Sequence, residues 1–410
     1  YSKEIEERVK EYWRSIKLFE KWALKNVGKD RFNFLEGPPY TTGSPHLGHT
    51  WNRVLKDVIL RYYAKKGYDV KARAGFDMHG LPIEQKVEEK LKIRDKREIE
   101  AKVGLSKFIK ECKEFAYGNM LEFIKLYNKI EHWQDIDYIY MPIQNEYIER
   151  VWEAIRKAYE KGLLYEEQKP VWWCPRCQTP LSNQEIELGY IDPLYKKSKD
   201  PSIYVKFRLK DRENEYFVIW TTTPWTLIFN MGIMVNPDEK YVKIKTKGIY
   251  VKSLEVEGEN LKNMEVEKED KEEFWIVSYK FLDKLKELGI EFEIVEEFYG
   301  KDLEGVDYIP PFYEEMKEIV EEIKKNNPNS YKIWLSKEYV RVEEGTGLVH
   351  SAPGCGFEDY EVAKKYNVKA FNTVDEDGTV KEIKAFEGWK AKINDLKWID
   401  LLIKKKLLLL

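Results

Sequence analysis

The sequence predicts a two-part α/β protein, in which an open parallel sheet covered by helices precedes an inserted β-rich α+β part. The first 165 residues follow the order strand, loop, helix, strand, which is typical of a parallel sheet. After Gly162, short β-rich runs alternate with turns, which is typical of an α+β or barrel-like domain. An amphipathic pattern returns at 394–410 and predicts a helix that leads back to the first domain.

Length and composition agree with two or more domains, because 410 residues exceed the size at which a single core usually stops growing. Hydrophobic residues make up 43% of the chain and charged residues 35%, and the mean hydropathy is -0.61, as in globular proteins. No apolar run is long enough to span a membrane and no basic-then-apolar leader opens the chain, so we expect a cytoplasmic protein with no membrane partner. A net charge of -3 neither indicates nor excludes a nucleic-acid partner.

Hydrophobic periodicity places the elements of the first part. Residues 2–25 suit one amphipathic helix, because apolar side chains recur there at spacings of three and four residues: Ile5, Val9, Trp13, Ile16 and Phe19. A strand at 32–35 precedes a helix at about 47–66, which Gly67 is placed to end. The other expected elements are a strand at 69–74 and helices at 106–131 and 145–161.

The second part is predicted to combine short strands with acidic helices. The strands are expected at 203–209, 216–220 and 241–245, and the helices near 277–288 and 312–325. We therefore expect an N-terminal helix with the first half of the parallel-sheet domain at 1–165, a connecting segment at 166–195, an inserted domain at 196–393 and a returning helix at 394–410.

The segment Gly-Ser-Pro-His-Leu-Gly-His at 43–49 has the form of a nucleotide-binding loop that opens a helix. Backbone N–H groups at a helix N-terminus bind phosphate well. His46 and His49 lie three residues apart on the first turn, and Gly48 between them lets a flat base approach the backbone. As hydrogen-bond donors, the two imidazoles can stabilise charge on a reacting phosphate. A structural histidine pair is the alternative.

Cys174 and Cys177 form Cys-Pro-Arg-Cys, which offers two thiolates at zinc-knuckle spacing. A tetrahedral structural site needs four ligands, and no second Cys-x-x-Cys or nearby histidine follows. The sequence therefore predicts half of a zinc site in the segment 166–195, with a metal-free turn as the alternative.

Three segments of the first part resemble the opening half of the Rossmann-like catalytic domain of class I aminoacyl-tRNA synthetases. They are Gly-Pro-Pro at 37–39, His-Leu-Gly-His at 46–49 and Gly-Phe-Asp-Met-His-Gly-Leu-Pro-Ile-Glu at 75–84. In the second part, Trp-Thr-Thr-Thr-Pro-Trp-Thr-Leu at 220–227 and Gly-Thr-Gly-Leu-Val-His-Ser-Ala-Pro at 345–353 resemble the editing domain of the isoleucyl enzymes. The valyl and leucyl relatives generally have Thr-Thr-Arg-Pro where this chain has Thr-Thr-Thr-Pro.

For the first part, the resemblance implies that Mg-ATP and isoleucine are substrates. His46, Gly48 and His49 match the ATP-binding signature, and both histidines would be catalytic. Asp77 would hold the ammonium group of the amino acid, and Pro38 would form part of the apolar wall around its side chain. A loop carboxylate that caps a helix is the alternative for Asp77.

For the second part, the resemblance implies hydrolytic editing of Val-tRNA. A pocket for isoleucine excludes valine weakly, because one methylene contributes only about 1–3 kcal/mol, a value known from this enzyme family itself. Thr221, Thr222 and Thr223 would position the terminal adenosine and water, and Asn230 the acceptor end. His350 would lie against the amino-acid side chain, and Asp359 would hold its ammonium group.

Two departures from the family pattern stand out. Ile228 and Phe229 replace a proline and a small residue, which changes the expected shape of the editing pocket. The Lys-x-Ser-Lys-type loop of class I enzymes is missing, and the string Leu-Ser-Lys-Glu at 335–338 is a coincidence of composition. Both ends of the chain resemble cuts, so we expect a missing C-terminal half, within the same polypeptide or on a separate chain, to supply that loop and the remaining zinc ligands.

The resulting expectation is an ATP-dependent ligase that joins isoleucine to tRNA(Ile) and hydrolyses mischarged Val-tRNA(Ile). A free-standing trans-editing aminoacyl-tRNA deacylase and a non-catalytic tRNA-binding paralogue are the alternatives. The second alternative leaves the nucleotide-binding loop unexplained.

Overall fold

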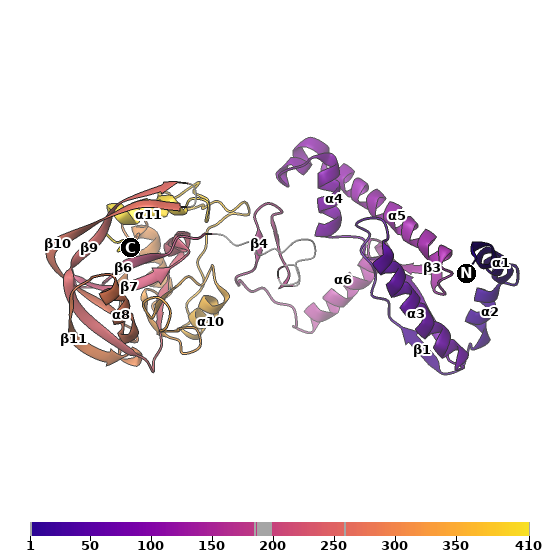
Figure 1. Cartoon of the computed structure of the whole chain (residues 1–410), viewed down its shortest axis with the longest axis horizontal. Helices are drawn as coiled ribbons and strands as arrows, with labels where there is room; N and C mark the ends of the chain where they lie inside the picture. The colour runs from indigo at the N-terminus through magenta and orange to yellow at the C-terminus, as the bar shows by residue number, and fades with distance from the viewer. Residues whose placement is uncertain (1, 184–185, 187–198, 258–259, 410) are drawn as a thin grey trace. The chain divides into compact units, whose positions relative to one another are not determined.

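The computed structural model describes residues 2–183, 186, 199–257 and 260–409, and these residues form two compact units (Figure 1). Unit 1 comprises residues 1–166 and unit 2 residues 167–410. The prediction of a parallel α/β part followed by a mixed, β-rich part is confirmed. Among the described residues, no helix combines the length and the apolar composition needed to cross a membrane.

Unit 1 is built on a three-stranded parallel sheet in the order β1-β2-β3. The strands are β1 (Arg31–Phe34), β2 (Asp69–Gly75) and β3 (Asp135–Tyr140). The crossover from β1 to β2 contains helix α3 (Leu47–Lys65), which ends where Gly67 adopts a positive φ of 97°. All three strands therefore end at the same edge of the sheet, and the loops that follow them share that edge.

Five further α-helices accompany this sheet among the described residues, and their bounds are α1 (Lys3–Ser15), α2 (Leu18–Lys25), α4 (Leu81–Leu91), α5 (Leu105–Lys129) and α6 (Asn145–Glu160). A short π-helix, η1 (Ile99–Val103), precedes α5. The single helix expected at 2–25 is two helices, because Lys17 adopts a left-handed conformation with a φ of 50° that interrupts the backbone ladder.

Two helices of unit 1 carry apolar side chains that face solvent. On α3 the exposed members are Leu47, Trp51, Val54, Leu55, Val58, Ile59 and Tyr62. On α6 they are Ile148, Val151, Trp152, Ile155 and Tyr159, and no residue of α6 is buried. Spacings of three and four residues line these side chains up along each helix, so each helix has a continuous apolar stripe that unit 1 does not cover.

Unit 2 contains a six-stranded sheet in the order β11-β9-β10-β7-β6-β12. Its strands are β6 (Ile203–Leu209), β7 (Glu215–Thr221), β9 (Lys240–Glu257), β10 (Asn260–Ser278), β11 (Phe292–Tyr299) and β12 (Tyr308–Ile309). A second sheet has the order β13-β8-β14, with β8 (Gly232–Val235) between β13 (Lys332–Leu335) and β14 (Leu348–Ser351). Short helices connect them: η2 (Pro224–Phe229), η3 (Tyr279–Phe281), α8 (Leu282–Glu287), η4 (Gly300–Leu303), α9 (Lys317–Asn326) and α10 (Phe357–Lys365).

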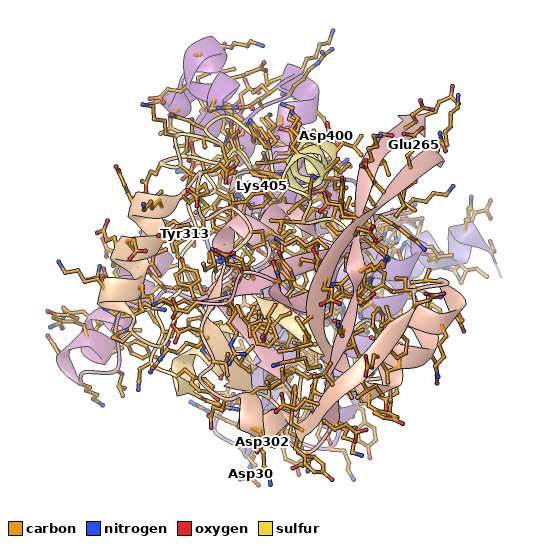
Figure 2. The ribbon with its side chains drawn as sticks, turned by 90° about the vertical axis from the view of Figure 1, so that its left-hand side faces the viewer. Asp30, Glu265, Asp302, Tyr313, Asp400 and Lys405 are labelled. Atoms are coloured by element: carbon orange, nitrogen blue, oxygen red, sulfur yellow. The ribbon has the colours of Figure 1, made fainter. Side chains whose placement is uncertain are left out.

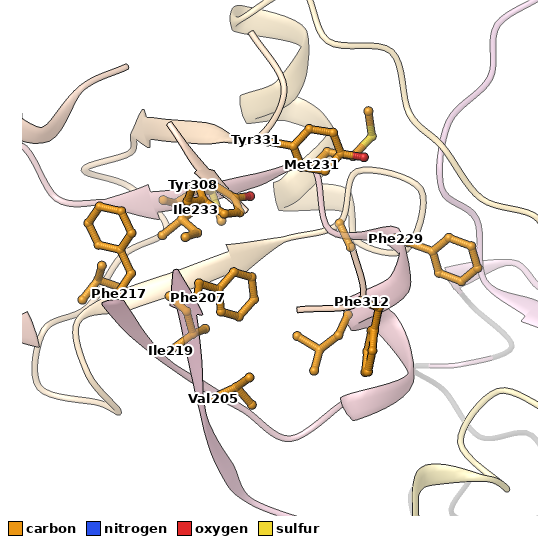
Figure 3. Packing of buried hydrophobic residues seen from close by; sticks show 14 of the residues in the cluster. Val205, Phe207, Phe217, Ile219, Phe229, Met231, Ile233, Tyr308, Phe312 and Tyr331 are labelled. Carbon is orange, nitrogen blue, oxygen red and sulfur yellow. The ribbon is translucent and has the colours of Figure 1, made fainter. Parts of the chain in front are cut away.

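The core of unit 2 lies between these two sheets. Figure 3 shows side chains from β6, β7 and β12 of the first sheet together with Ile233 of β8, Phe229 of η2 and Met231 after it. The labelled members are Val205, Phe207, Phe217, Ile219, Phe229, Met231, Ile233, Tyr308, Phe312 and Tyr331, and all of them are buried. This cluster is the larger of two buried hydrophobic clusters among the described residues of unit 2, and the second one includes Trp275 and Phe281.

The last helix, α11 (Asp395–Lys404), packs into this core, with Trp398 and Leu402 among the buried residues of the cluster. Trp398 is fully buried and lies 4.4 Å from the ring centroid of Trp389. Figure 2 shows α11 in yellow with Asp400 and Lys405, and the Lys405 ammonium pairs with Glu315 at 2.9 Å. The apolar face of α11 is therefore buried within unit 2.

Residues 407–409 then pair with two strands of unit 2. The Lys206 amide donates to the Leu407 carbonyl at 2.9 Å, and the Leu409 amide donates to Tyr204 at 2.9 Å. On the other side, the Val251 amide of β9 donates to the Leu408 carbonyl at 2.8 Å. The tail thereby bridges β6 to β9 and covers backbone groups that an open sheet edge would expose.

Candidate functional sites

The first candidate site is the turn that opens α3. His46 caps the helix: its Nδ1 accepts a hydrogen bond from the Gly48 amide at 3.1 Å. The His46 amide in turn donates to Nδ1 of His49 at 3.2 Å, and the two ring centroids lie 3.9 Å apart. Because each Nδ1 accepts, each neutral ring carries its proton on Nε2. The turn therefore offers two N–H donors at an exposed helix N-terminus.

The environment of this turn holds His49 more firmly than His46. The His49 ring meets Phe123 of α5 edge to face, with 4.8 Å between ring centroids, whereas His46 is exposed. Partial burial lowers the pKa of His49, and the positive charges of His46 and Arg53 lower it further. At Gly48, a Cβ would lie 3.0 Å from Cε1 of His46, so a larger residue would displace the capping ring.

A buried polar network anchors the loop that precedes this turn. Glu36 pairs with the Arg53 and Lys56 side chains of α3. It lies two residues after the end of β1, next to the exposed Leu35. Gln134 donates to the Glu36 carboxylate at 2.8 Å and to the Arg73 carbonyl at 2.9 Å. Burial opposes ionisation of Glu36, but Arg53, Lys56 and Gln134 outweigh it and lower the pKa of that carboxyl.

Asp77 and Pro38 lie in loops that are joined at the same edge of the sheet. The Asp77 amide donates to the Pro39 carbonyl at 2.9 Å, and the Thr41 amide donates to the Asp77 carbonyl at 3.0 Å. Asn119 of α5 donates to the Thr41 carbonyl at 2.9 Å and so fixes this junction. Pro38 and Asp77 are both half-buried. The carboxylate and the apolar ring therefore share the strand-end edge from which α3 begins, which is where ligands bind in parallel α/β sheets.

The second candidate site lies in unit 2, where β7 runs into η2. Thr221 is buried at the end of β7, and its hydroxyl accepts from the Thr223 amide at 3.1 Å. Thr222 and Thr223 are exposed. The Thr226 hydroxyl donates to the Thr223 carbonyl at 2.8 Å and also contacts Nε2 of His350 at 2.9 Å. These contacts join the threonine run to His350 on β14.

His350 and Asp359 are enclosed more than the exposed threonines. The His350 side chain is 9% exposed, and burial lowers its pKa to about 4. Asp359 lies in the first turn of α10, and burial raises its pKa to about 6, although the Ala352 amide beside it favours the ionised form. A Cβ at Gly356 would lie 2.4 Å from a carboxylate oxygen of Asp359, so only glycine leaves room for this carboxylate.

Asn230 is engaged inside the core. It is 2% exposed, its Nδ2 donates to the Gly232 carbonyl at 2.8 Å, and its Oδ1 accepts from the Tyr308 hydroxyl at 2.6 Å. Ile228 and Phe229 are buried as well, and Phe229 packs against Phe371 with 5.9 Å between centroids. The two residues that depart from the family pattern therefore fill the core.

Cys174 and Cys177 lie on a small antiparallel hairpin formed by β4 (Trp173–Cys174) and β5 (Thr179–Pro180). They form no disulfide, and the Cys177 amide donates to the Cys174 sulfur at 3.4 Å. Within the described part of the chain, no group of three or more His, Cys, Asp or Glu side chains is arranged to hold a metal ion. The hairpin presents two thiols, and a tetrahedral zinc ion would need two further ligands.

Sequence reasoning missed two parts of these sites. The Glu36–Arg53 pair was not expected, although two charged residues next to a strand end and on the following helix are a usable signal. Thr226 was not expected, because the three consecutive threonines at 221–223 are the stronger sequence signal. Its place three residues after Thr223, at the end of a one-turn pattern, is the signal that could have found it.

Comparison with known proteins adds three relatives and one family. The family model of tRNA synthetases class I (I, L, M and V) matches residues 8–397. The isoleucine–tRNA ligase of Pyrococcus horikoshii is 42% identical over 388 residues, which cover 94% of this chain and 34% of that protein. The Pyrococcus abyssi enzyme is 41% identical over 406 residues, which cover 98% of this chain and 35% of that protein. The Methanocaldococcus jannaschii enzyme is 40% identical over 412 residues, which cover 99% of this chain and 37% of that protein.

The chain thus spans about a third of the length of these relatives. Among solved structures, one titled as the crystal structure of GlLeuRS-CP1 aligns with 51% of this chain at 16% identity and a TM-score of 0.34. The identity and the TM-score of this match are too low to support an argument about either site.

Proposed function

The chain belongs to the class I tRNA synthetases (I, L, M and V), and from this premise we propose that it carries two sites of an isoleucine–tRNA ligase, one for activation and one for proofreading. The isoleucine–tRNA ligases compared above are about 40% identical to this chain over nearly its whole length, which supports isoleucine as the amino acid. Unit 1 would activate isoleucine with Mg-ATP, and unit 2 would hydrolyse Val-tRNA(Ile).

In the activation step, an oxygen of the isoleucine carboxylate forms a bond to the α-phosphorus of ATP. The bond to the bridging oxygen breaks, and pyrophosphate leaves with that electron pair. The Nε2–H groups of His46 and His49 would donate to phosphate oxygens, where they stabilise developing negative charge. Gly48 keeps the capping ring in place, and Mg²⁺ enters with ATP as part of the substrate.

Isoleucine would bind at the joined loops of the same edge. The Asp77 carboxylate would accept hydrogen bonds from the ammonium group, because a desolvated ammonium needs a charged partner. Pro38 would contact the branched side chain. The isoleucyl adenylate then passes its acyl group to tRNA(Ile), which is the macromolecular partner that this function requires.

In the proofreading step, a water oxygen attacks the ester carbonyl carbon of Val-tRNA, the ester C–O bond breaks, and the ribose hydroxyl leaves with a proton. The exposed hydroxyls of Thr222 and Thr223 would bind the terminal adenosine and orient this water, with Thr221 supporting the turn from below. Asp359 would hold the ammonium group of valine, and His350 would border its side chain. Asn230 would act indirectly, by holding the core beneath the site.

The exposed apolar stripes of α3 and α6 support a further partner for unit 1. Side chains such as Trp51 and Trp152 are more than 60% exposed, at 69% and 66%, which is unusual for tryptophan in a finished domain. We attribute both stripes to contact with a covering polypeptide, either later residues of the same chain or a separate chain. That polypeptide would also bring the two ligands that complete a zinc site with Cys174 and Cys177.

The joined loops that bring Pro38, Asp77 and the α3 turn to one edge carry this proposal, and two comparisons in one assay test it. Isoleucine-dependent ATP–pyrophosphate exchange by the 410-residue chain alone should be weak and should rise when a covering polypeptide is added. Robust exchange by the chain alone would contradict that dependence. An Asp77→Asn variant should remove the remaining exchange, while Asp95→Asn, at a half-buried loop residue of unit 1 that pairs with Arg97, should not change it.

A free-standing deacylase is the second candidate function, and one observation favours it. Unit 2 has a complete core, and its own residues 407–409 bridge β6 to β9, so its proofreading site needs nothing from unit 1 to form. The two functions separate in one experiment: a deacylase hydrolyses Val-tRNA(Ile) but shows no exchange even when the covering polypeptide is present.

A further inference from the structure

Thr226 has a role that follows from where its single proton goes. Its hydroxyl oxygen lies 2.8 Å from the Thr223 carbonyl, 3.2 Å from the Thr223 hydroxyl and 2.9 Å from Nε2 of His350. Thr226 is on η2 and His350 is on β14, and both side chains are buried. The contact therefore links the threonine turn to the strand that carries the histidine.

The proton count of this cluster determines the tautomer of His350. A carbonyl oxygen can only accept, so the 2.8 Å contact is favourable only if Thr226 donates its O–H to Thr223. A hydroxyl has one proton, and the Thr226 oxygen is therefore an acceptor toward the imidazole at 2.9 Å. Nε2 of His350 must carry the hydrogen, and Nδ1 must be the bare nitrogen.

The other nitrogen of His350 has no competing partner to reverse this choice. Among the described residues, Nδ1 is buried and accepts no hydrogen bond. Burial also lowers the pKa of the ring to about 4, so the ring is neutral at pH 7. Without the Thr226 oxygen, both ring nitrogens would be buried without a protein partner, and neither tautomer nor ring orientation would be specified.

We propose that Thr226 is a positioning residue, which holds His350 in its Nε2–H tautomer and in one ring orientation. His350 then acts as a neutral wall of the proofreading site and takes no proton during hydrolysis. The statement about the wall rests on the proposed function, whereas the statement about the tautomer does not need a substrate.

The test is ¹⁵N NMR of the full chain labelled in histidine. The chain has five histidines, and the His350→Gln variant identifies the lost signals. Native His350 should show a protonated Nε2 and an unprotonated Nδ1 at pH 7. Thr226→Val, which keeps the shape and removes the hydroxyl, should give mixed tautomers, and Thr226→Ser should restore the native pattern. An unchanged single Nε2–H tautomer in a folded Thr226→Val variant would overturn the proposal, as would a native Nδ1–H tautomer.

Hydrolysis of Val-tRNA(Ile) separates this proposal from the proposed function. Thr226→Val should slow hydrolysis about tenfold, the effect of one lost neutral hydrogen bond, and Thr226→Ser should stay within about twofold of the native rate. Equal rates for Thr226→Val and native chain would overturn the positioning role. No hydrolysis by a native chain with the expected tautomer would instead count against the proofreading function alone. Thermal unfolding of each variant confirms that it is folded.

Discussion

The two units of this chain differ in how completely each builds its own site. In unit 1, the imidazole pair lies at the start of α3, beside a three-stranded sheet, and helices α3 and α6 of this unit expose apolar stripes. In unit 2, the threonine turn and His350 border a large closed core, and residues 407–409 of the same chain cover its strands. The site in unit 2 is therefore held in place by the core beneath it. The site in unit 1 depends on a further polypeptide that would cover the apolar stripes of α3 and α6.

The two candidate sites also differ in whether their charged groups are paired. Unit 1 pairs its buried Glu36 with Arg53 and Lys56, so that the carboxylate stays ionised and anchors a loop. At the second site, burial lowers the pKa of His350 to about 4 and raises that of Asp359 to about 6, so the two shifts are opposite in direction. The paired Glu36 at the first site has a structural role, because it fixes a loop. Titratable groups with shifted pKa values that form no ion pair with another described residue, such as His350 and Asp359 at the second site, are typical of a binding site.

The largest expected effect tests whether unit 2 stands alone. Trp398→Ala should lower the free energy of unfolding of unit 2 by about 3–5 kcal/mol, because it opens a cavity between Phe386 and Trp389. Unit 1 should be unaffected. Hydrogen exchange followed by mass spectrometry distinguishes the units, and Lys404→Ala, at an exposed position of α11, is the control. Equal loss of protection in both units would show that their stabilities are coupled.

The next effect concerns substrate binding in unit 2. Asp359→Asn should slow hydrolysis of Val-tRNA(Ile) about 100-fold, because a desolvated ammonium loses its charged partner. Glu358→Gln, on the neighbouring and exposed position of α10, should leave the rate nearly unchanged. A native rate for Asp359→Asn, measured from the initial release of valine, would remove Asp359 from the site.

The opposite pKa shifts of His350 and Asp359 predict opposite pH effects on the stability of unit 2. The His350 pKa falls from 6.5 to about 4, so its stabilising contribution is complete above pH 6.5 and is lost as the pH falls toward 4. The Asp359 pKa rises from 3.8 to about 6, so protonation of the folded protein adds stability as the pH falls from 6 to 4. In native unit 2 the two effects largely cancel.

Replacing either His350 or Asp359 should reveal the pH dependence of stability that the remaining group causes. Asp359→Asn should lose about 2 kcal/mol of stability between pH 6.5 and 4 relative to the native chain, and His350→Gln should gain stability over the same range. Urea unfolding at each pH measures both. Parallel pH curves for the two variants would contradict the assigned shifts.

The smallest expected effect sharpens the account of unit 1. Trp51→Lys on the α3 stripe should change the stability of the isolated chain by less than about 0.5 kcal/mol, because this side chain is exposed. The same change should greatly weaken the rise in pyrophosphate exchange when a covering polypeptide is added. Lys65→Gln, near the end of α3, is the matched control. A large stability loss in the isolated chain would mean that α3 is already covered.

Much of the fold could be predicted because local pattern and tertiary structure agree. The strand expected at 203–209 is β6, and the helix expected at 47–66 is α3 within one residue. Of the long hairpin of β9 and β10, only the start of β9 was predicted, as the strand at 241–245. The rest was missed because its outer half is rich in Lys and Glu, whose cross-strand pairs, such as Lys252 with Glu267, carry no hydrophobic signal. Likewise, no periodicity reveals that Lys17 interrupts the first helix.

The candidate sites divide in the same way. The motif residues of the α3 turn are contiguous, so their grouping follows from the sequence, whereas the capping bonds that link His46 to Gly48 and His49 are known only from the structure. The contact of Thr226 with His350 spans 124 residues and depends on how η2 meets β14. The burial of Asn230 beside Tyr308 depends equally on long-range packing. Chemistry within a turn can be read from sequence, whereas chemistry across a core cannot.

The most direct test of the central claim is the initial rate at which the 410-residue chain, without ATP and without any covering polypeptide, releases valine from Val-tRNA(Ile). A self-sufficient site in unit 2 predicts a rate well above that of buffer, reduced by Asp359→Asn. A folded chain that releases valine no faster than buffer would contradict the claim that unit 2 forms a complete proofreading site by itself.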